Sequence, residues 1–185
     1  KREARNQAHL SHSNIVTVYG FIEYGDLLGI VMEFIDAPSV DKLIFKYKKL
    51  HINDAVLILK QVLAGIGFAH SKGYIHRDIK PENILVNSEL VLKIVDFGLA
   101  LIKDDNVLTH KSTIVGTPGY MSPEQIRGEK SPQTDLFSAG IVIYELFTGT
   151  NPFIGDNVSE TINNILNFEE DLLIPNGFAP SSPNR

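Results

Sequence analysis

The sequence contains no cysteine and no long run of basic residues, and each absence excludes a class of protein. Without cysteine the chain has no disulfide and no thiolate metal site, which is compatible with the cytoplasmic location that we expect. Seventeen basic and 22 acidic residues give a net charge of -5, and basic residues never stand more than two in a row. We therefore expect no nucleic acid and no anionic membrane surface as the main partner.

We also expect no signal peptide at the start of this segment, and the sequence has no long apolar run. Apolar runs such as Ala139 to Tyr144 are far shorter than the roughly 20 residues of a membrane span, so we expect no span in this segment. The 185 residues suffice for one good-sized core, and their oligomeric state is left open. Because the chain starts without Met and within a helical pattern, we expect it to be a piece of a longer protein.

The most polar stretch is His76-Arg77-Asp78-Ile79-Lys80-Pro81-Glu82-Asn83, which packs five ionisable side chains and an amide into eight residues. Two short apolar runs follow, 84–86 and 91–94, and the polar turn between them predicts a β-hairpin. Because a hairpin returns the chain to its starting end, Asn83 and Asp96 are expected to lie side by side. Two such oxygen ligands suit a hard divalent cation such as Mg2+, with waters and substrate phosphates as the other ligands.

His-Arg-Asp-x-Lys-x-x-Asn followed by Asp-Phe-Gly resembles the catalytic loop and the metal-binding motif of eukaryotic-like protein kinases. The alternative is a polar surface loop beside a hairpin, and the two motifs in this order disfavour it. The resemblance implies that Asp78 orients the substrate hydroxyl and accepts its proton, and that Lys80 neutralises the transferring phosphoryl group. It also implies that Asn83 and Asp96 hold the metal ions, with ATP and Mg2+ as cofactors.

The first part of the chain resembles the small lobe of the same family. Residues 1–10 predict the end of a helix, and the runs 15–21 and 27–34, separated by a polar turn, predict a second hairpin. Glu3 falls at the position of the helix αC glutamate, which in the family pairs with a lysine that holds the ATP phosphates. One turn later the family usually has an apolar residue, where this chain has Gln7.

Met32-Glu33-Phe34-Ile35, at the exit of this hairpin, resembles the kinase hinge. Any buried strand has a similar pattern, so this interpretation depends on the catalytic motifs downstream. The resemblance implies that the carbonyl of Glu33 and the amide of Ile35 meet the adenine edge, and that Leu85 forms the floor beneath it. The implied nucleotide-binding residues are Glu3, Glu33, Ile35, Lys80, Asn83, Leu85 and Asp96.

Three further segments predict helices. Residues 40–47 predict a short helix, and Asn53 is the expected N-cap of a long helix that reaches about Ser71. The run 135–147 is apolar nearly all round and resembles the buried helix αF, whose Asp135 accepts hydrogen bonds from the catalytic-loop backbone. His76 is expected to pack under the Phe of Asp-Phe-Gly and not to act as the base. The long helix is expected to face inward with Val56, Leu59, Leu63, Ile66 and Phe68.

Residues 99–112 have no sustained periodicity and predict a surface loop. The following segment, Gly116 to Glu124, resembles the peptide-binding loop of the family and its Ala-Pro-Glu end, with Ser122 in a small-for-small exchange for Ala. The resemblance implies that Thr117 hydrogen-bonds to Asp78 and Lys80 around a Ser or Thr hydroxyl.

The same loop offers candidate sites of regulation. Arg77 directly precedes the expected base, and a phosphate on the loop would give its guanidinium a bidentate, charge-assisted partner. The loop offers Thr109, Ser112 and Thr113, of which we favour Thr113 first and Thr109 second. An unmodified, solvated loop is the alternative.

We therefore predict an α+β chain with a protein-kinase-like fold, running from the end of helix αC to about helix αG. Residues 1–36 would be a remnant of the small-lobe sheet with the hinge, and residues 37–185 a C-terminally truncated large lobe. No Gly-x-Gly-x-x-Gly phosphate loop and no strand lysine precede Glu3, so we expect little activity from the isolated segment.

Lys80 and the Gly-Thr-x-x-Tyr run favour a Ser/Thr kinase, and the Ser-Pro-Glu-Gln-x-x-Gly run resembles bacterial members. The predicted reaction is transfer of the ATP γ-phosphoryl group to a Ser or Thr hydroxyl of a protein substrate. A pseudokinase, or a truncated scaffold that binds without catalysis, is the first alternative. A small-molecule phosphotransferase of related fold is the second, and the well-formed peptide-binding segment weakens it.

Overall fold

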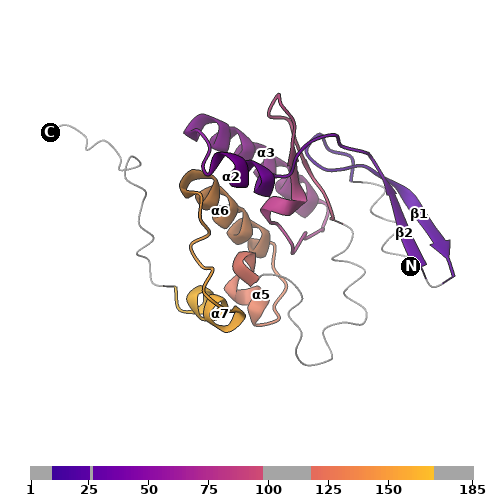
Figure 1. Cartoon of the computed structure of the whole chain (residues 1–185). Helices are drawn as coiled ribbons and strands as arrows, with labels where there is room; N and C mark the ends of the chain where they lie inside the picture. The colour runs from indigo at the N-terminus through magenta and orange to yellow at the C-terminus, as the bar shows by residue number, and fades with distance from the viewer. Residues whose placement is uncertain (1–9, 26, 98–117, 169–185) are drawn as a thin grey trace.

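A computed structural model of the chain describes residues 10–25, 27–97 and 118–168 (Figure 1). The described residues form a protruding hairpin and a mainly helical body, joined through a second, buried hairpin. This mixture of helices and small sheets confirms the predicted α+β class. In chain order the elements are β1 (Val18–Tyr24), β2 (Leu27–Met32), α2 (Val40–Tyr47), α3 (Ile52–Ser71), the 3-10 turn η2 (Pro81–Asn83), β3 (Ile84–Val86), β4 (Leu92–Ile94), the 3-10 turn η4 (Pro118–Tyr120), α5 (Pro123–Ile126), α6 (Gln133–Thr148) and α7 (Val158–Leu166).

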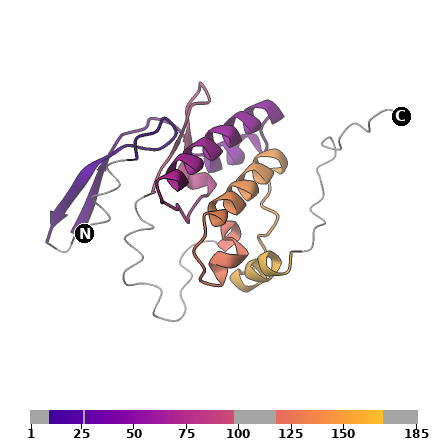
Figure 2. The same cartoon turned by 180° about the vertical axis from the view of Figure 1, so that it is seen from behind.

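The first hairpin pairs β1 with β2 in antiparallel fashion and extends away from the helical body (Figure 2). The hairpin was predicted, but its strands are displaced from the predicted runs 15–21 and 27–34. Tyr24, expected in the turn, pairs with Leu27, and Gly25 takes the positive φ of 57° that such a tight turn requires. At the other end, Ile15 lies outside β1 and forms a parallel bridge with Ile94 of β4.

The second hairpin, β3 with β4, is buried between the helices and the chain that leads into β1. Ile84, Val86, Leu92 and Ile94 are each 1% exposed or less. Burying such aliphatic side chains stabilises the fold by about 1.5–3 kcal/mol each. This hairpin therefore belongs to the core of the helical body.

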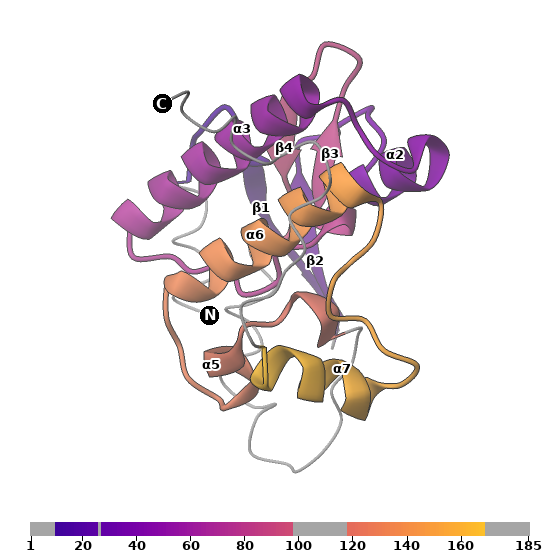
Figure 3. The same ribbon diagram turned by 90° about the vertical axis from the view of Figure 1, so that its left-hand side faces the viewer.

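Helices α3 and α6 lie side by side and form most of that body (Figure 3). α3 starts one residue before the predicted N-cap Asn53, because the ring of His51 accepts the hydrogen bond of the Asn53 amide at 3.3 Å. Of the predicted inward face of α3, Ile66 is buried and Phe68 is half-buried against the core, whereas Leu63 is exposed. The residues of α3 that are buried are Ala55, Ile58, Val62, Gly65, Ile66 and Ala69.

By length and composition alone, α3 would also suit a membrane span, although no continuous apolar run of the sequence reaches such a length. Its buried side chains belong to the same core cluster as Ile84 and Ile94 of the second hairpin and Val142 of α6. We therefore assign α3 to the core of the helical body.

A single α3 side chain, that of Gln61, joins three segments of the chain. Its Oε1 accepts hydrogen bonds from the Leu92 amide and from Asn14 Nδ2, both at 3.0 Å, and its Nε2 donates to the carbonyl of Leu90 at 2.7 Å. The same helix comes so close to β4 that a Cβ at Gly65 would lie 3.0 Å from the side chain of Ile94. β4 is thus held against α3 by packing and by hydrogen bonds.

Candidate active site

The backbone of the polar stretch 76–83 is held in place by Asp135 of α6. This fully buried carboxylate accepts hydrogen bonds from the amides of His76 at 2.8 Å and Arg77 at 2.7 Å. His70, at the end of α3, contacts the same carboxylate through Nε2 at 2.7 Å. With this support Arg77 adopts a positive φ of 65°, which a non-glycine residue rarely does without fixed neighbours. The predicted role of Asp135 is confirmed.

His76 packs beneath Phe97, as predicted, and both of its ring nitrogens are used. Nε2 donates to the carbonyl of Val95 at 2.8 Å, and Nδ1 accepts from the amide of Asp78 at 3.2 Å. The two rings meet edge to face with centroids 4.4 Å apart. Burial lowers the pKa of His76, which favours the neutral ring. A neutral imidazole with both nitrogens occupied is a structural group and cannot serve as the base.

The carboxylate of Asp78 is open to solvent and is oriented by two neighbouring donors. Its side chain is 51% exposed, and Lys80 Nζ lies 2.9 and 3.1 Å from its two oxygens. Asn83 Nδ2 donates to the same carboxylate at 3.1 Å and to the Asp78 carbonyl at 2.8 Å. A carboxylate that is held in one direction and still accessible has the properties of a general base.

Asn83 and Asp96 flank the buried hairpin on the same side, as the sequence predicted. Ile84 pairs with Ile94, and the amide of Val95 donates to the carbonyl of Asn83 at 2.9 Å. Asp96 follows with a positive φ of 66°, which turns the chain out of the strand direction.

These two residues fit a Mg2+ ion. Because Asn83 uses Nδ2 toward Asp78, its Oδ1 is the atom that can bind a cation, alongside the Asp96 carboxylate. In the described ranges no group of three or more His, Asp or Glu side chains is placed to hold a metal by itself. An ion here would therefore need waters or phosphate oxygens as further ligands.

The predicted nucleotide-binding residues Glu33, Ile35 and Leu85 lie on adjoining segments. Leu85 is half-buried on the face of β3 opposite to the core. It forms a bridge with Ser39, and the carbonyl of Pro38 accepts a hydrogen bond from the Val86 amide at 2.9 Å. The connecting segment 33–38 therefore ends beside Leu85, where the adenine floor was predicted.

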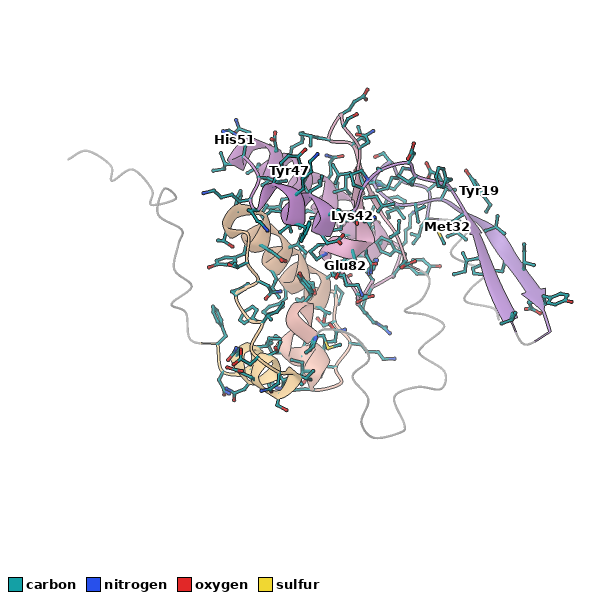
Figure 4. The ribbon with its side chains drawn as sticks, viewed as in Figure 1. Tyr19, Met32, Lys42, Tyr47, His51 and Glu82 are labelled. Atoms are coloured by element: carbon teal, nitrogen blue, oxygen red, sulfur yellow. The ribbon has the colours of Figure 1, made fainter. Side chains whose placement is uncertain are left out.

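A small, mostly apolar pocket lies beside the predicted metal site. It is enclosed by the β1–β2 hairpin, the chain that leads into it and the start of the Asp-Phe-Gly motif. The residues that line it are Leu10, Ile15, Val16, Val18, Ile30, Met32, Asp96 and Phe97. Met32 lies at the end of the hairpin that is nearest to the helical body (Figure 4).

Several predicted site residues lie outside the described residues. They are Glu3, Thr117, Thr109, Ser112 and Thr113. Their expected contacts stay predictions. Of the predicted regulatory residues, Arg77 is described: its side chain is half-buried, and its carbonyl accepts a hydrogen bond from Gln125 Nε2 at 2.8 Å.

Ser122 does more than replace a small residue, which the sequence analysis missed. Its side chain is fully buried and caps α5 by accepting from the amide of Gln125 at 3.2 Å. Its hydroxyl also lies 3.1 Å from that of Thr134 at the start of α6. The sequence does contain the pattern of a helix start here. Ser-Pro-Glu-Gln has a capping Ser, a Pro at the first helical position and a Gln three residues after the cap.

Tyr120, just before α5, is joined to α6 by a short hydrogen bond. Its hydroxyl donates to Glu145 Oε2 at 2.5 Å. Burial raises the pKa of Glu145, and burial together with this carboxylate raises the pKa of Tyr120 well above its usual range. The contact attaches the segment that was predicted to bind peptide to α6.

Comparison with known proteins now identifies the family. A family model described as protein kinase domain matches residues 1–183. The chain belongs to the protein kinase family. This membership explains why the acidic residue, the lysine and the two metal-binding candidates occur together around one hairpin.

The relatives and a solved structure agree with this assignment. The chain is 38% identical to the probable serine/threonine-protein kinase PknB of Lactococcus lactis in an alignment 181 residues long, which covers 93% of this chain and 29% of that protein. It is 37% identical to serine/threonine-protein kinase PrkC of Bacillus subtilis over 158 residues, or 85% of this chain and 24% of that protein. The predicted resemblance to bacterial Ser/Thr kinases is confirmed, and the chain spans 24% to 29% of these relatives' length.

The predicted kinase fold is confirmed by structure as well. The crystal structure of Rad53 1-466 in complex with AMP-PNP aligns with a TM-score of 0.76 and 32% sequence identity. The alignment covers 89% of this chain and 42% of that one. Nearly all of this kinase chain therefore has a counterpart in a solved kinase structure.

Proposed function

We propose that the full-length protein carrying this chain transfers the γ-phosphoryl group of ATP to a Ser or Thr hydroxyl of a protein substrate. The observation that carries the proposal is the carboxylate of Asp78. It is open to solvent, oriented by Lys80 and Asn83, and placed beside the end of the hairpin that leads to Asp96. Kinase relatives described as acting on serine and threonine support the choice of hydroxyl.

In the proposed reaction each of these side chains has a distinct task. The Asp78 carboxylate accepts the proton that the substrate hydroxyl loses as it attacks phosphorus. Lys80, whose ammonium already lies 2.9 Å from that carboxylate, offers its charge to the phosphoryl oxygens. Asn83 Oδ1 and the Asp96 carboxylate would hold Mg2+. The bound Mg-ATP supplies the phosphoryl group and the divalent charge that offsets the charge on the phosphates.

The predicted adenine contacts belong to the same proposal. The Glu33 carbonyl and the Ile35 amide would bind the edge of the base, and Leu85 would lie beneath its ring. The bridge between Ser39 and Leu85 supports this, because it brings the end of the hinge segment next to the proposed floor. Glu3 would complete the phosphate site through a lysine that pairs with it.

Regulation by phosphorylation is part of the proposal. Arg77 would bind a phosphate on Thr113, or with second preference on Thr109, and so order the loop that leads to the peptide site. If this holds, phosphatase treatment and Arg77→Ala should lower activity by similar factors, without further loss in combination. Full activity of a protein with Ala at Thr109, Ser112 and Thr113 would contradict it.

The reaction itself is tested by incubating the purified full-length protein with Mg-ATP and a mixed protein substrate, followed by mapping of phosphorylated residues by mass spectrometry. We expect phosphate on Ser and Thr, and a loss of about a thousandfold in rate for Asp78→Asn. Asp54→Asn, an acidic residue in the first turn of α3, is the matched control and should keep the rate. Transfer to small molecules alone, or a fully active Asp78→Asn variant, would contradict the proposal.

A further inference from the structure

Lys93 is a charged residue in the middle of a buried strand. Its neighbours in β4, Leu92 and Ile94, are completely buried, so its own side chain extends from the opposite face of the hairpin. On that face its partner across the ladder is Leu85, the proposed floor beneath adenine. Lys93 Nζ lies 2.9 Å from Glu33 Oε2 and 3.4 Å from the carbonyl of Ile15. A lysine of the β3–β4 hairpin thus reaches Glu33, the first residue of the connecting segment 33–38 that contains the predicted hinge contacts.

Glu33 is held on two further sides. Its Oε2 also accepts a hydrogen bond from the amide of Thr17 at 3.1 Å, and its own amide donates to the Thr17 carbonyl at 2.8 Å. The side chains of Lys93 and Glu33 are only 20% and 27% exposed, which shields the pair from solvent more than a surface ion pair. The hydrogen bond from Lys93 lowers the pKa of Glu33, so this carboxylate is ionised at neutral pH.

The hinge segment 33–38 contains no helix and no strand, and it is attached to the β3–β4 hairpin at both ends. At its far end the attachment uses the backbone, through Pro38, Ser39 and β3. At its near end the attachment to β4 uses the side chains of Glu33 and Lys93. Phe34, between the two ends, is 88% exposed and adds little packing. The near end is also linked to β4 by backbone, because Glu33 pairs with Thr17 and the Val16 amide donates to the Ile94 carbonyl at 2.9 Å. The direct link between Glu33 and β4 depends on the identity of residue 93.

We infer that Lys93 is a positioning residue that fixes the Glu33 carbonyl at the base-binding edge and thereby sets the preference of the site for adenine nucleotides. The inference rests on the proposed function, in which that carbonyl accepts a hydrogen bond from the nucleotide. Adenine carries an amino donor at its 6-position, whereas hypoxanthine carries an oxygen there, which a carbonyl repels. Lys93 lies within β4 and Asp96 follows this strand, so β4 would position both the adenine base and the metal ion.

The test is the binding of ATP and of inosine triphosphate, measured by calorimetry with the full-length protein in the presence of Mg2+. Lys93→Met keeps the length of the side chain and removes its charge. We expect it to lower the preference for ATP by about fivefold, the factor that corresponds to an ion pair of about 1 kcal/mol. Lys93→Arg, which keeps a charged donor, should retain most of the preference, and Lys60→Met on the exposed face of α3 should retain all of it.

The ratio of the two affinities separates positioning from a general effect on the fold, because a destabilised protein would bind both nucleotides less well in equal measure. If Lys93→Met does not fold, Glu33→Gln removes the same charge pair and should show the same fall in preference. An unchanged preference in the folded variant overturns the inference alone, provided that the wild type binds ATP and phosphorylates protein. A wild type that binds neither nucleotide would overturn the proposed function as well.

Discussion

The two hairpins of this chain have the same topology and opposite surroundings. In β3–β4 the side chains of Ile84 and Leu92 are completely buried, whereas in β1–β2 Tyr24 is 82% exposed and Leu27 is 73% exposed. One hairpin is part of the core of the helical body, and the other extends from it with apolar side chains in solvent (Figures 1 and 4).

This difference in burial divides the proposed site into a phosphoryl-transfer half beside the buried hairpin and a base-binding half beside the exposed hairpin. Asn83 and Asp96, which flank the buried hairpin, are held by contacts within the described residues. Met32 is the last residue of the exposed hairpin and Glu33 follows it, and their position relative to the body depends on a few contacts such as the Lys93–Glu33 pair. The phosphoryl-transfer half is therefore expected to be more rigid than the base-binding half.

The difference in burial between the two hairpins is tested most strongly by removing one large side chain from each. Leu92→Ala leaves a cavity in a fully packed core and should lower the free energy of unfolding by about 3 kcal/mol. Ile22→Ala, at a side chain that is 60% exposed, should lower it by less than about 0.5 kcal/mol. Both values come from urea denaturation of the full-length protein. Equal losses would mean that the exposed hairpin is covered in the full-length protein.

Gln61 attaches the buried hairpin to α3 by hydrogen bonds, for which the exposed hairpin has no counterpart among the described residues. Gln61→Met keeps the shape of the side chain but leaves the Leu92 amide and Asn14 Nδ2 without their acceptor. We expect a loss of about 2 kcal/mol in the free energy of unfolding. The control is Gln133→Met on the first turn of α6, and a loss of similar size there would contradict the role of Gln61.

The pH dependence of stability provides a smaller test. Burial lowers the pKa of His76 below its usual 6.5, so near that pH the unfolded chain binds a proton that the folded chain does not. Stability should therefore fall as the pH decreases below about 6.5, by at most about 1.4 kcal/mol per pH unit. Glu145 has the opposite sign, because its raised pKa makes stability fall as the pH rises above its usual 4.5.

The His76 contribution is measured by urea denaturation at pH 7.5, 6.5 and 5.5. His76→Gln removes the titrating group, so its stability should change less with pH than that of the wild type. Gln133→Met, which removes no titrating group, should keep the wild-type dependence. A dependence that is the same in His76→Gln and in the wild type would show that other groups cause it.

The sequence predicted the parts of the site that depend on local order. The catalytic loop, the hairpin and Asp96 follow one another within 21 residues, from His76 to Asp96, so turn chemistry and strand alternation were enough to bring Asn83 and Asp96 together. The burial of much of α6 was predictable for a similar reason, because a helix that is apolar nearly all round must cover most of its surface. The prediction was wrong at Leu136, which is 49% exposed.

Features that depend on distant contacts were not predictable. α3 has apolar residues on more than one side, so periodicity did not reveal which of them faces the core, and the predicted face was wrong at Leu63. The contact between Lys93 and Glu33 joins residues 60 apart, and that between Gln61 and Asn14 joins residues 47 apart. No local pattern reports such pairs. The cap at Ser122 is the exception, because its signal is local: Ser, Pro and Gln stand at the positions that cap and start a helix.

The proposed roles of Asp78 and Asp96 are tested most directly by measuring ATP binding and phosphoryl transfer on the same preparations of the full-length protein. If Asp78 is the base and Asp96 a metal ligand, Asp78→Asn should bind Mg-ATP within about twofold of the wild type and lose about a thousandfold in turnover. Asp96→Ala should lose both Mg-ATP binding and turnover. An Asp78→Asn protein with nearly wild-type turnover, or an Asp96→Ala protein that binds and uses Mg-ATP normally, would contradict the account.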